Sequence, residues 1–485
     1  MATSSPSPLR LLFVLCSIIG FGCTDPLIIG SNGGTGGQGG AGAGGGGGTQ
    51  APSRRFIRDE QGRAVILHGL NIANDAKSDP LRVGATTAEF ILYMSRAWGF
   101  NVSRHLIFWD AIEPEPGVYD EAYLDRLGER LDWYAEAGVF VILDMHQDVY
   151  SSVFCCDGAP GWAVRSDGIA FEPRDVWWAN YLEPAVERAF DNFWDYEGAN
   201  GDLQEAYISA CLHVIERFGD HPAVLGYDLM NEPDPGSMGT SAFESTTLPQ
   251  FYDRFIARIR EVDPDGWIFY EPAAFIVNPG GPSDLGSVQD TRAGDSHLVY
   301  APHLYDPTIF LSGGYDGPAA IERWESNRLA EVDERHPAPL VIGELGAGPP
   351  DYHRDVLEMA DRLGSGWMLW SSDSFFAAFL DGREPADILD LVRVTAQRVA
   401  GDPIDFTYNP ALRVFSLRFA QRQGVEGPTE IYIPEVRIYP DGWTLSVSDP
   451  QGSWSSDWDP ERGVLSIMTD PSQTEHVVRI DPGTL

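Results

Sequence analysis

Short apolar runs alternate with amphipathic stretches along the chain from about residue 54 to residue 400. In Tyr123–Gly138, for example, Leu124, Leu127 and Leu131 fall on one helical face. Eight runs are predicted as strands: Val65–Ile72, Asn101–Phe108, Phe140–Asp148, Val224–Glu232, Trp267–Glu271, His297–Tyr305, Leu340–Glu344 and Gly366–Ser371. Because strand and helix alternate this regularly, the pattern predicts an α/β fold, a closed parallel (β/α)8 TIM barrel over residues 54–400.

The pattern changes after residue 400, where apolar and polar positions alternate with a period of two. The runs that follow this period are Phe406–Tyr408, Val414–Phe419, Glu430–Ile433, Trp443–Val447 and His476–Ile480. Turn residues such as Asp441-Gly442 separate them. Residues 401–485 are therefore predicted to form a small C-terminal all-β sandwich domain.

The first 53 residues have the composition of an export signal followed by a tether. Arg10 precedes the apolar run Leu11–Gly22, which is too short to span a membrane as a mature helix. The run ends at Gly22-Cys23, which resembles a bacterial lipoprotein cleavage site, so residues 1–23 predict either lipidation or plain secretion. Residues 24–53 are glycine-rich and predict a flexible linker. The expected location is outside a bacterial cell, secreted or as a cell-surface lipoprotein.

Polar and aromatic side chains stand at almost every predicted strand end. In a parallel barrel these ends meet on one face, which holds the active site. The residues concerned are Asn71, Arg104, His146, Asp148, Asn231, Glu232, Glu271, His303, Tyr305, Glu344 and Trp370. Two strands end in a single glutamate each, Glu232 and Glu344, and a pair of carboxylates is what cleavage of a glycosidic bond requires. The barrel is therefore predicted to act on carbohydrate.

The net charge and the cysteine pattern argue against nucleic-acid binding and against a zinc site. A net charge of −39 repels phosphate backbones, so no nucleic-acid partner is expected. No Cys/His spacing suggests zinc, and neither a cofactor nor a metal is predicted. Cys155 and Cys156 are adjacent, so a bond between them is expected to be strained, and their pairing stays open.

The barrel resembles glycoside hydrolase family 5. The matching stretches are Asn101–Arg104, Asp144–His146, Asn231–Pro233, His303–Tyr305, Gly343-Glu344 and Trp370. Within that family the chain looks most like the endoglycoceramidases, through Asp75–Ser78, Asp144–Tyr150, Gly158–Ala163, Phe190–Trp194, Trp370–Asp373 and Pro428–Pro434. Leu345, where phenylalanine usually follows the nucleophile, and Cys155–Asp157, in place of a longer loop, depart from the pattern. These departures bear on the preferred glycan.

The resemblance implies a role for each strand-end residue. Glu344 is expected to be the nucleophile and Glu232 the acid/base, and Asn231 is expected to hydrogen-bond the sugar 2-hydroxyl. The supporting residues are Arg104 and Tyr305, which would hold Glu344 ionised, and His303 beside Glu232. The residues implied to bind the first sugar are Lys77, His146 and Asp148, with Trp370 and Trp177 as aromatic platforms. Trp178 is an alternative to Trp177, and His146 is also compatible with a core histidine or with a metal pair that lacks a third ligand.

These features together predict a retaining endo-β-glycosidase that hydrolyses the bond between the oligosaccharide and the ceramide of glycosphingolipids. The alternative enzyme is a β-1,4-endoglucanase or a β-glucosidase acting on soluble β-glucosides, and a third reading is a catalytically inactive glycan-binding protein. A lipid substrate would bring a monomer into transient contact with lipid aggregates or membranes. Phe375, Phe376, Phe379 and Leu380 are candidates for the wall of a lipid slot, although they would also suit packing on the C-terminal domain.

Overall fold

The computed structural model describes residues 55–385 and 388–483. The predicted export signal (1–23), with Cys23, and the glycine-rich linker (24–53) lie outside the described residues. Among the helices of the described ranges, none has both the length and the apolar character needed to cross a membrane.

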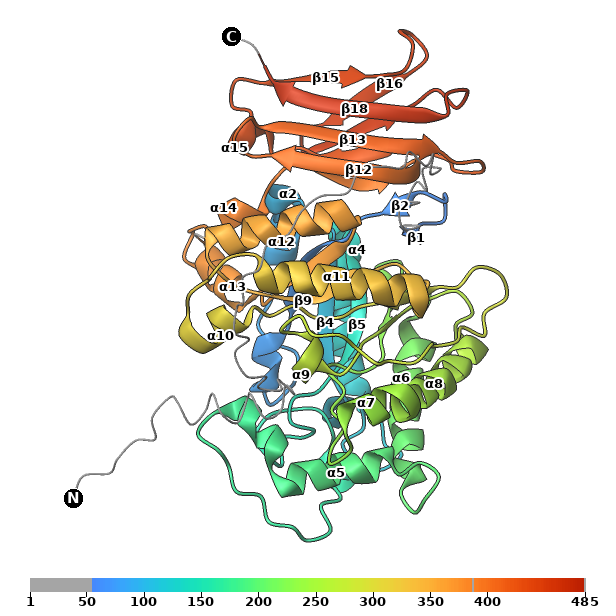
Figure 1. The fold of residues 1–485 in the computed structure, drawn as a ribbon, viewed down its shortest axis with the longest axis vertical. Coiled ribbons are helices and arrows are strands. Elements are labelled where there is room, and N and C mark those ends of the chain that lie inside the picture. Colours follow the sequence, from blue (N-terminus) through green and yellow to red (C-terminus); the bar gives the residue numbers. More distant parts are fainter. Residues whose placement is uncertain (1–54, 386–387, 484–485) are drawn as a thin grey trace, which may run out of the picture. The chain divides into compact units, whose positions relative to one another are not determined.

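Eight parallel strands form the barrel (Figure 1), in the order β8-β7-β6-β5-β4-β3-β10-β9. Their bounds are β3 His68–Ile72, β4 Val102–Phe108, β5 Phe140–His146, β6 Val224–Asp228, β7 Trp267–Tyr270, β8 Leu298–Tyr300, β9 Val341–Gly346 and β10 Gly366–Trp370. Parallel bridges from Tyr300 to Leu340 and from Leu304 to Leu345 join the two outer strands. The predicted closed barrel is confirmed, and each strand falls within or beside its predicted run.

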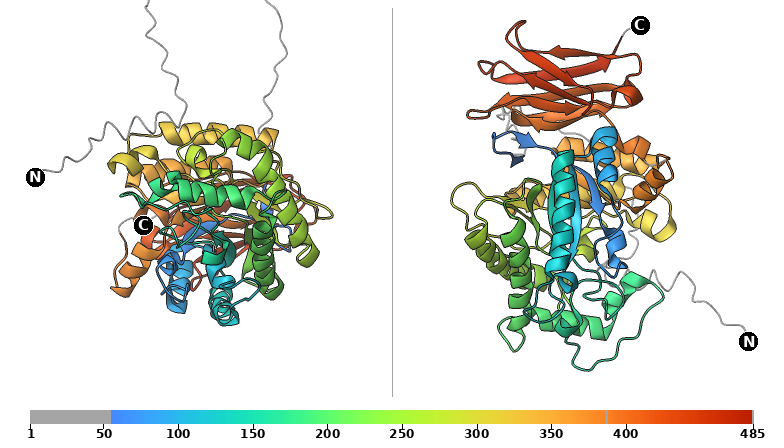
Figure 2. Two further views of the ribbon diagram at one scale, coloured as in Figure 1. Left: turned by 90° about the horizontal axis from the view of Figure 1, so that it is seen from below. Right: turned by 180° about the vertical axis from the view of Figure 1, so that it is seen from behind.

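Helices cover the outside of the strands (Figures 1 and 2). The long ones are α2 Ala88–Trp98, α4 Glu121–Ala137, α5 Pro184–Trp194, α6 Gly201–Phe218, α8 Leu248–Val262, α11 Ala319–Glu334 and α12 Pro350–Leu363. Short helices lie in the loops: η1 Asn74–Lys77, α3 Trp109–Ile112, η2 Gly161–Ala163, η3 Trp177–Leu182, α7 Thr240–Ala242, η4 Phe243–Thr247, α9 Ala274–Val277, α10 Pro307–Ser312, α13 Asp373–Leu380 and α14 Ile388–Leu391. Helix α4 begins where the Asp120 side chain accepts the Tyr123 N–H at 2.9 Å, and it ends at Gly138, whose φ of 69° is left-handed.

The C-terminal domain is built from two antiparallel sheets. The six-stranded sheet contains β1 Ile57–Arg58, β2 Ala64–Val65, β11 Thr395–Val399, β14 Thr429–Tyr432, β17 Val464–Met468 and β16 Ser455–Asp459. The four-stranded sheet contains β12 Gly401–Asn409, β13 Val414–Gln421, β18 Glu475–Pro482 and β15 Trp443–Val447, and α15 Glu435–Ile438 lies in a connection. Leu417 and Ile480 of one sheet and Ile431 and Leu465 of the other share one buried core. The predicted sandwich is confirmed.

The predicted first barrel strand, Val65–Ile72, is in fact parts of two strands. Val65 belongs to β2, which pairs with β1 and β11, and the barrel strand β3 begins only at His68. Between them Ile66 enters the sandwich core, whereas Leu67 packs with the barrel strands. Since one uninterrupted apolar run serves two cores, periodicity alone did not locate the break.

The pairing of Cys155 and Cys156, which the sequence left open, is a disulfide bond between the two. One further expectation is wrong. Phe375 and Phe376, proposed for a lipid slot, are 2% and 9% exposed. Their rings contact Trp98 and Phe90 of helix α2, respectively, so these side chains fill the layer between α13 and α2.

Candidate active site

Glu232 and Glu344 face each other at the carboxyl ends of β6 and β9. One carboxylate oxygen of each residue and one ring nitrogen of His303 all lie within 4.8 Å of one another. Enzymes that invert the sugar need room for a water molecule and separate their carboxyl groups by about 6.5–9.5 Å, whereas retaining enzymes keep them about 5 Å apart. The spacing here is that of a retaining pair.

The local backbone turns Glu232 toward this partner. Its φ is +43°, a conformation that residues other than glycine adopt only when the surroundings hold them there. Here the Glu232 N–H donates to Glu271 Oε2 at 3.0 Å, and Gln147 Nε2 donates to the Glu232 carbonyl at 3.0 Å. At the carboxylate, Asn278 Nδ2 lies 2.6 Å and His303 Nδ1 lies 2.8 Å from Oε1.

Glu344 is fixed by two donors. Tyr305 donates its hydroxyl to Oε2 at 2.7 Å, and Arg104 Nη1 donates to Oε1 at 2.8 Å. Both contacts stabilise the ionised carboxylate, the form that a nucleophile needs. The sequence-based placement of Arg104 and Tyr305 at Glu344 matches this geometry.

Arg104 is a fully buried cation at the centre of the barrel. Besides Glu344 its guanidinium contacts Asp144 Oδ1 at 3.0 Å, Asp228 Oδ2 at 2.9 Å, Glu271 Oε1 at 3.0 Å, Asn231 Oδ1 at 2.9 Å and Asn71 Oδ1 at 3.1 Å. Burial alone would lower the pKa of Arg104, but the surrounding carboxylates outweigh it and raise the pKa well above its usual value. The permanent charge of Arg104 is what allows several carboxylates to lie side by side here.

His303 links the two glutamates. Its Nε2 lies 3.1 Å from Glu271 Oε1, and its Nδ1 lies 3.6 Å from Glu344 Oε2 as well as next to Glu232. Burial lowers the pKa of His303, yet the charges of Glu271 and Glu344 prevail and raise it well above its usual range. An imidazolium at this point donates to Glu232 and screens the two carboxylates from each other.

Four predicted sugar-binding residues contact one another in the site. Lys77, the only lysine of the chain, donates to Asp148 and lies 4.3 Å from the centre of the Trp370 ring. The His146 ring stacks on Trp370 at 5.4 Å, and its Nε2 is 3.7 Å from Asp148. Burial and Lys77 lower the pKa of His146, but the hydrogen bond with Asp144 at 2.7 Å helps to raise it to about 9. His146 is nevertheless buried, with 2% of its surface exposed, and its role in binding the first sugar stays a prediction.

Trp177 is not joined to these four. It lies on η3 with half of its side chain exposed, and within residues 55–385 and 388–483 it makes no recorded ring contact. Its neighbour Trp178 contacts the Phe310 ring at 5.8 Å. The assignment of Trp177 as a sugar platform stays a prediction.

Within residues 55–385 and 388–483, two groups of side chains have the donor atoms of a metal site. His146, Asp148 and Asp157 form one, so the histidine does have a third potential ligand, and Glu232, His303 and Glu344 form the other. In the first group, however, the Lys77 ammonium already bonds Asp148. In the second, His303 carries the positive charge. Protein cations thus neutralise both groups.

Several residues of the site were missed by sequence reasoning. Asp144 and Asp228, inside apolar strands, are buried partners of Arg104, and a charge within a buried strand is a signal that such a partner exists. Gln147 holds the backbone of Glu232 and adjoins predicted residues. Asn278 follows α9 in a loop, and nothing in its sequence context indicates that it would reach Glu232.

Asp157 is a buried carboxyl group close to the charge of Lys77. It is fully buried, and neither carboxylate oxygen has a hydrogen-bond partner in the described part of the chain. Burial raises the pKa of Asp157 to about 6; the charge of Lys77 opposes this shift and that of Asp148 adds to it. Between about pH 4 and pH 6 the folded protein therefore keeps a proton that an ordinary aspartate has released.

We expect Asp157→Asn to change how stability depends on pH. In the wild type the contribution of Asp157 to the free energy of unfolding falls as the pH rises from 4 to 6, because its carboxyl keeps the extra proton in the folded state. The variant lacks this loss, so its free energy of unfolding relative to that of the wild type should increase by on the order of 2 kcal/mol from pH 4 to pH 7. Urea unfolding of both proteins at pH 4 and at pH 7 measures this difference. Parallel pH dependences in the two proteins would contradict the assignment, and a single [ε-¹³C]lysine resonance from Lys77 should report the same titration in the wild type alone.

Comparisons with known proteins agree with this geometry. Residues 59–375 match the model of the cellulases of glycosyl hydrolase family 5, and residues 393–481 match the family 5 C-terminal domain. Endoglycoceramidase I of Rhodococcus hoagii (strain 103S) is 30% identical over 450 residues, which cover 88% of this chain and 87% of the relative. An endoglycoceramidase of Cyanea nozakii is 26% identical, over 82% of this chain and 86% of the relative. The structure of endo-glycoceramidase II from Rhodococcus sp. in complex with ganglioside GM3 superimposes with a TM-score of 0.82 at 34% identity, covering 89% of this chain and 100% of that one. The chain is therefore a glycoside hydrolase that belongs to family 5.

Proposed function

We propose that the protein hydrolyses the bond between the oligosaccharide and the ceramide of glycosphingolipids, with retention at the sugar. The observation that carries the proposal is a retaining pair of glutamates in a chain similar, over most of its length, to endoglycoceramidases. Glu344 attacks the anomeric carbon while Glu232 protonates the oxygen that leaves with the ceramide. Glu232 then removes a proton from water, which attacks the glycosyl–enzyme bond and regenerates Glu344.

The surrounding residues assist each step. Arg104 and Tyr305 donate hydrogen bonds that orient the Glu344 carboxylate for the attack, and Asn231, itself oriented by Arg104, is placed to bind the sugar 2-hydroxyl. His303 and Asn278 orient the carboxyl of Glu232. Lys77, His146, Asp148 and Trp370 offer charged groups and a ring face to the first sugar.

Exposed apolar side chains on the acid/base side support a lipid leaving group. Asn278, which contacts Glu232, directly follows α9, and Phe275 of α9 is 41% exposed. The Phe275 ring contacts Tyr181 of η3, and Phe310 of α10 is 54% exposed and contacts Trp178 of η3. We call these three helices with their aromatic rings the apolar rim. A ceramide released at Glu232 would find its alkyl chains beside this rim.

We expect Phe310→Asp to weaken action on lipid aggregates selectively. A phenylalanine that is covered only on binding contributes on the order of 1–2 kcal/mol, so KM for micellar glycolipid should rise about tenfold. Hydrolysis of a soluble aryl lactoside should not change, since its leaving group does not reach the rim. Leu412→Asp, which replaces an exposed apolar residue between β12 and β13, is the matched control. Equal KM values for Phe310→Asp and wild type would remove the apolar rim from the lipid site.

Product analysis tests the function directly. Purified protein is incubated with a ceramide-linked oligosaccharide in mild detergent, and both products are identified by mass spectrometry. The proposal expects intact oligosaccharide and free ceramide. Release of single monosaccharides would identify an exo-acting β-glucosidase instead, and activity confined to soluble β-glucan would identify an endoglucanase.

The same proposal includes where and in what form the enzyme acts. An export signal with a flexible linker would present a monomer outside the cell, secreted or held by a lipid on Cys23, in transient contact with lipid aggregates or membranes. Mass spectrometry of the exported protein separates lipidation from plain secretion, and light scattering tests the monomer.

A further inference from the structure

The Cys155–Cys156 disulfide closes a small ring in the loop that follows β5. The bond joins neighbouring residues, so the ring includes the peptide bond between them and restricts the rotation of this part of the backbone. Cys156 packs against the barrel core. Cys155 is exposed, and its Sγ accepts the side chain of Asn180 of η3 at 3.6 Å. The ring is therefore held on both sides, and Asp157 follows it directly.

The backbone directly after Asp148 has an uncommon conformation. Val149 and Tyr150 have φ values of 55° and 70°, in the left-handed region that residues other than glycine seldom adopt and that is least favourable for a β-branched side chain. Such conformations persist only where the surroundings hold them. The orientation of the Asp148 carboxylate therefore depends on what holds this turn.

Residues 157–159 hold the turn. Asp148 and Asp157 exchange two backbone hydrogen bonds of 3.3 Å each, and the Ala159 N–H donates to the Tyr150 carbonyl at 2.7 Å. The carboxylate of Asp157 has no hydrogen-bond partner in the described part of the chain. Asp157 is thus placed by its backbone and by the disulfide ring immediately before it.

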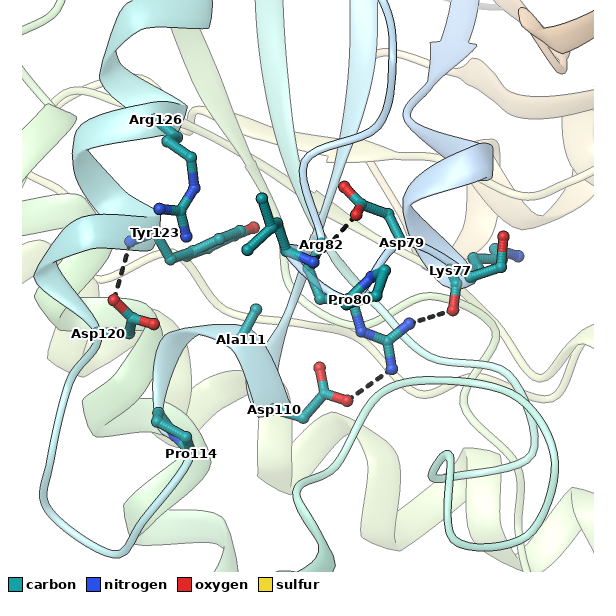
Figure 3. A pocket seen from close by; sticks show the side chains of 12 residues that line it. Lys77, Asp79, Pro80, Arg82, Asp110, Ala111, Pro114, Asp120, Tyr123 and Arg126 are labelled. Carbon is teal, nitrogen blue, oxygen red and sulfur yellow. Dashed lines mark hydrogen bonds and ion pairs between the residues drawn. The ribbon is translucent and has the colours of Figure 1, made fainter.

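Residues 157–159 also reach Lys77 by two routes. On the first, Asp148 accepts the Lys77 ammonium. On the second, the Gly158 carbonyl accepts the Asp110 N–H at 2.9 Å. Arg82 then donates to Asp110 Oδ2 at 2.7 Å and to the Lys77 carbonyl, as the dashed lines of Figure 3 show. Both the side chain and the backbone of Lys77 are held by residues that bond to this segment.

We propose that the Cys155–Cys156 disulfide is a redox-sensitive positioning element for the predicted glycan-binding pair Lys77 and Asp148. The inference rests on the proposed function, which assigns this pair to the first sugar, and deepens it by naming the oxidation state in which the sugar site is complete. Reduction opens the ring and frees the backbone before Asp157. Residues 157–159 then hold the turn less firmly, and the pair loses its fixed geometry.

The catalytic glutamates should be affected less than the sugar site. The carboxylates of Glu232 and Glu344 receive their hydrogen bonds from other loops and strands of the barrel. The expected defect of the reduced protein is therefore in sugar binding and not in bond cleavage. A contact made equally with substrate and transition state changes KM while kcat stays nearly constant.

Reduction by a dithiol is a balanced exchange. A thiolate of dithiothreitol attacks the exposed Cys155 Sγ, and the sulfur of Cys156 leaves as a thiolate and takes up a proton. The second thiol of the reductant, as its thiolate, attacks the mixed disulfide, and Cys155 leaves and is protonated in turn. The reductant is oxidised to its cyclic disulfide. Disulfides persist outside the reducing cytosol, in agreement with the export proposed for this chain.

The test measures KM before and after reduction. Full-length protein is reduced with dithiothreitol, a thiol count confirms that the bond is open, and hydrolysis of an aryl lactoside is followed. Freeing the backbone of one residue corresponds to a loss of affinity of about fivefold to thirtyfold, so KM should rise by about that factor. Reoxidation should restore the original KM.

Two variants control for other effects of the reductant. Cys155→Ser combined with Cys156→Ser reproduces the open pair, so this double variant should have the raised KM and should not respond to dithiothreitol. Cys211→Ala removes the free, buried cysteine of α6 and is the matched control, with the same response as the wild type. A double variant with the KM of the oxidised wild type would overturn the proposal.

Two measurements without cleavage separate this proposal from the proposed function. Lys77 is the only lysine, so [ε-¹³C]lysine gives one resonance, which should shift on reduction. Calorimetric titration with lactose should show the same loss of affinity as KM. If no ceramide is released but both changes occur, the positioning role stands and the ceramide substrate does not. If reduction changes the urea midpoint alone, or shifts the resonance without weakening lactose binding, the disulfide does not position the sugar site.

Discussion

Glu344→Gln is expected to abolish hydrolysis of every substrate, by about 10⁴-fold or more, because no covalent intermediate can form without the nucleophile. The amide keeps the size of the side chain and accepts from Tyr305 at the same oxygen position. The variant should therefore fold normally and still bind glycan. Steady-state kinetics with glycolipid and with an aryl lactoside measure the loss.

Glu232→Gln should behave differently, and the difference identifies the roles. Loss of general acid catalysis should lower the rate of glycolipid hydrolysis about 10²–10⁴-fold, because the ceramide alkoxide is a poor leaving group without a proton. A nitrophenyl lactoside needs no protonation, so its first step should proceed and a glycosyl–enzyme adduct should accumulate on Glu344, visible by mass spectrometry.

Glu113→Gln is the control for both glutamate variants. Glu113 is buried but accepts hydrogen bonds from Trp109 Nε1 at 2.8 Å and from the Gly117 N–H at 2.7 Å, which marks it as a loop organiser. Glu113→Gln should therefore leave the ratio of the hydrolysis rates of glycolipid and aryl lactoside as it is in the wild type. An adduct on Glu232, or loss of the aryl activity in Glu232→Gln equal to that in Glu344→Gln, would reverse or remove the assignments.

Arg104→Leu should cause the largest loss of stability. Removing one partner of a buried ion pair costs about 3–5 kcal/mol, and here Asp144, Asp228, Glu271 and Glu344 all lose their shared cation. The carboxylates then take up protons, so the deficit in unfolding free energy should shrink as the pH falls from 7 to 5. Urea unfolding at these pH values measures it.

Arg104→Lys keeps the prediction testable if the leucine variant does not fold. A lysine restores the charge but not the planar fork that reaches oxygens on four strands and their loops, so activity should stay low while stability partly returns. Arg260→Leu is the matched control, since the ion pair of Arg260 with Asp290 at 2.8 Å is nearly buried but single. A loss for Arg104→Leu no larger than for Arg260→Leu would show that the cluster does not depend on one cation.

Much of the fold was readable from residue order alone. Apolar runs mark the barrel strands because a strand covered on both faces has few polar positions, and the period of two marks the sandwich because only one face of each strand is buried. The sequence also predicted the pair Glu232 and Glu344, for a related reason. A glutamate that ends a buried strand in a barrel has only the common active-site face to occupy.

The tertiary structure decided what depends on contacts between distant segments. It placed the strands β1 and β2 in the sandwich sheet, next to β11 from more than 300 residues later. It also paired Asp144 and Asp228 with Arg104, brought Asn278 to Glu232, and buried Phe375 and Phe376 where a lipid slot was expected. Sequence patterns report which face of an element is buried. They do not report which other element covers that face, and that choice located the apolar rim.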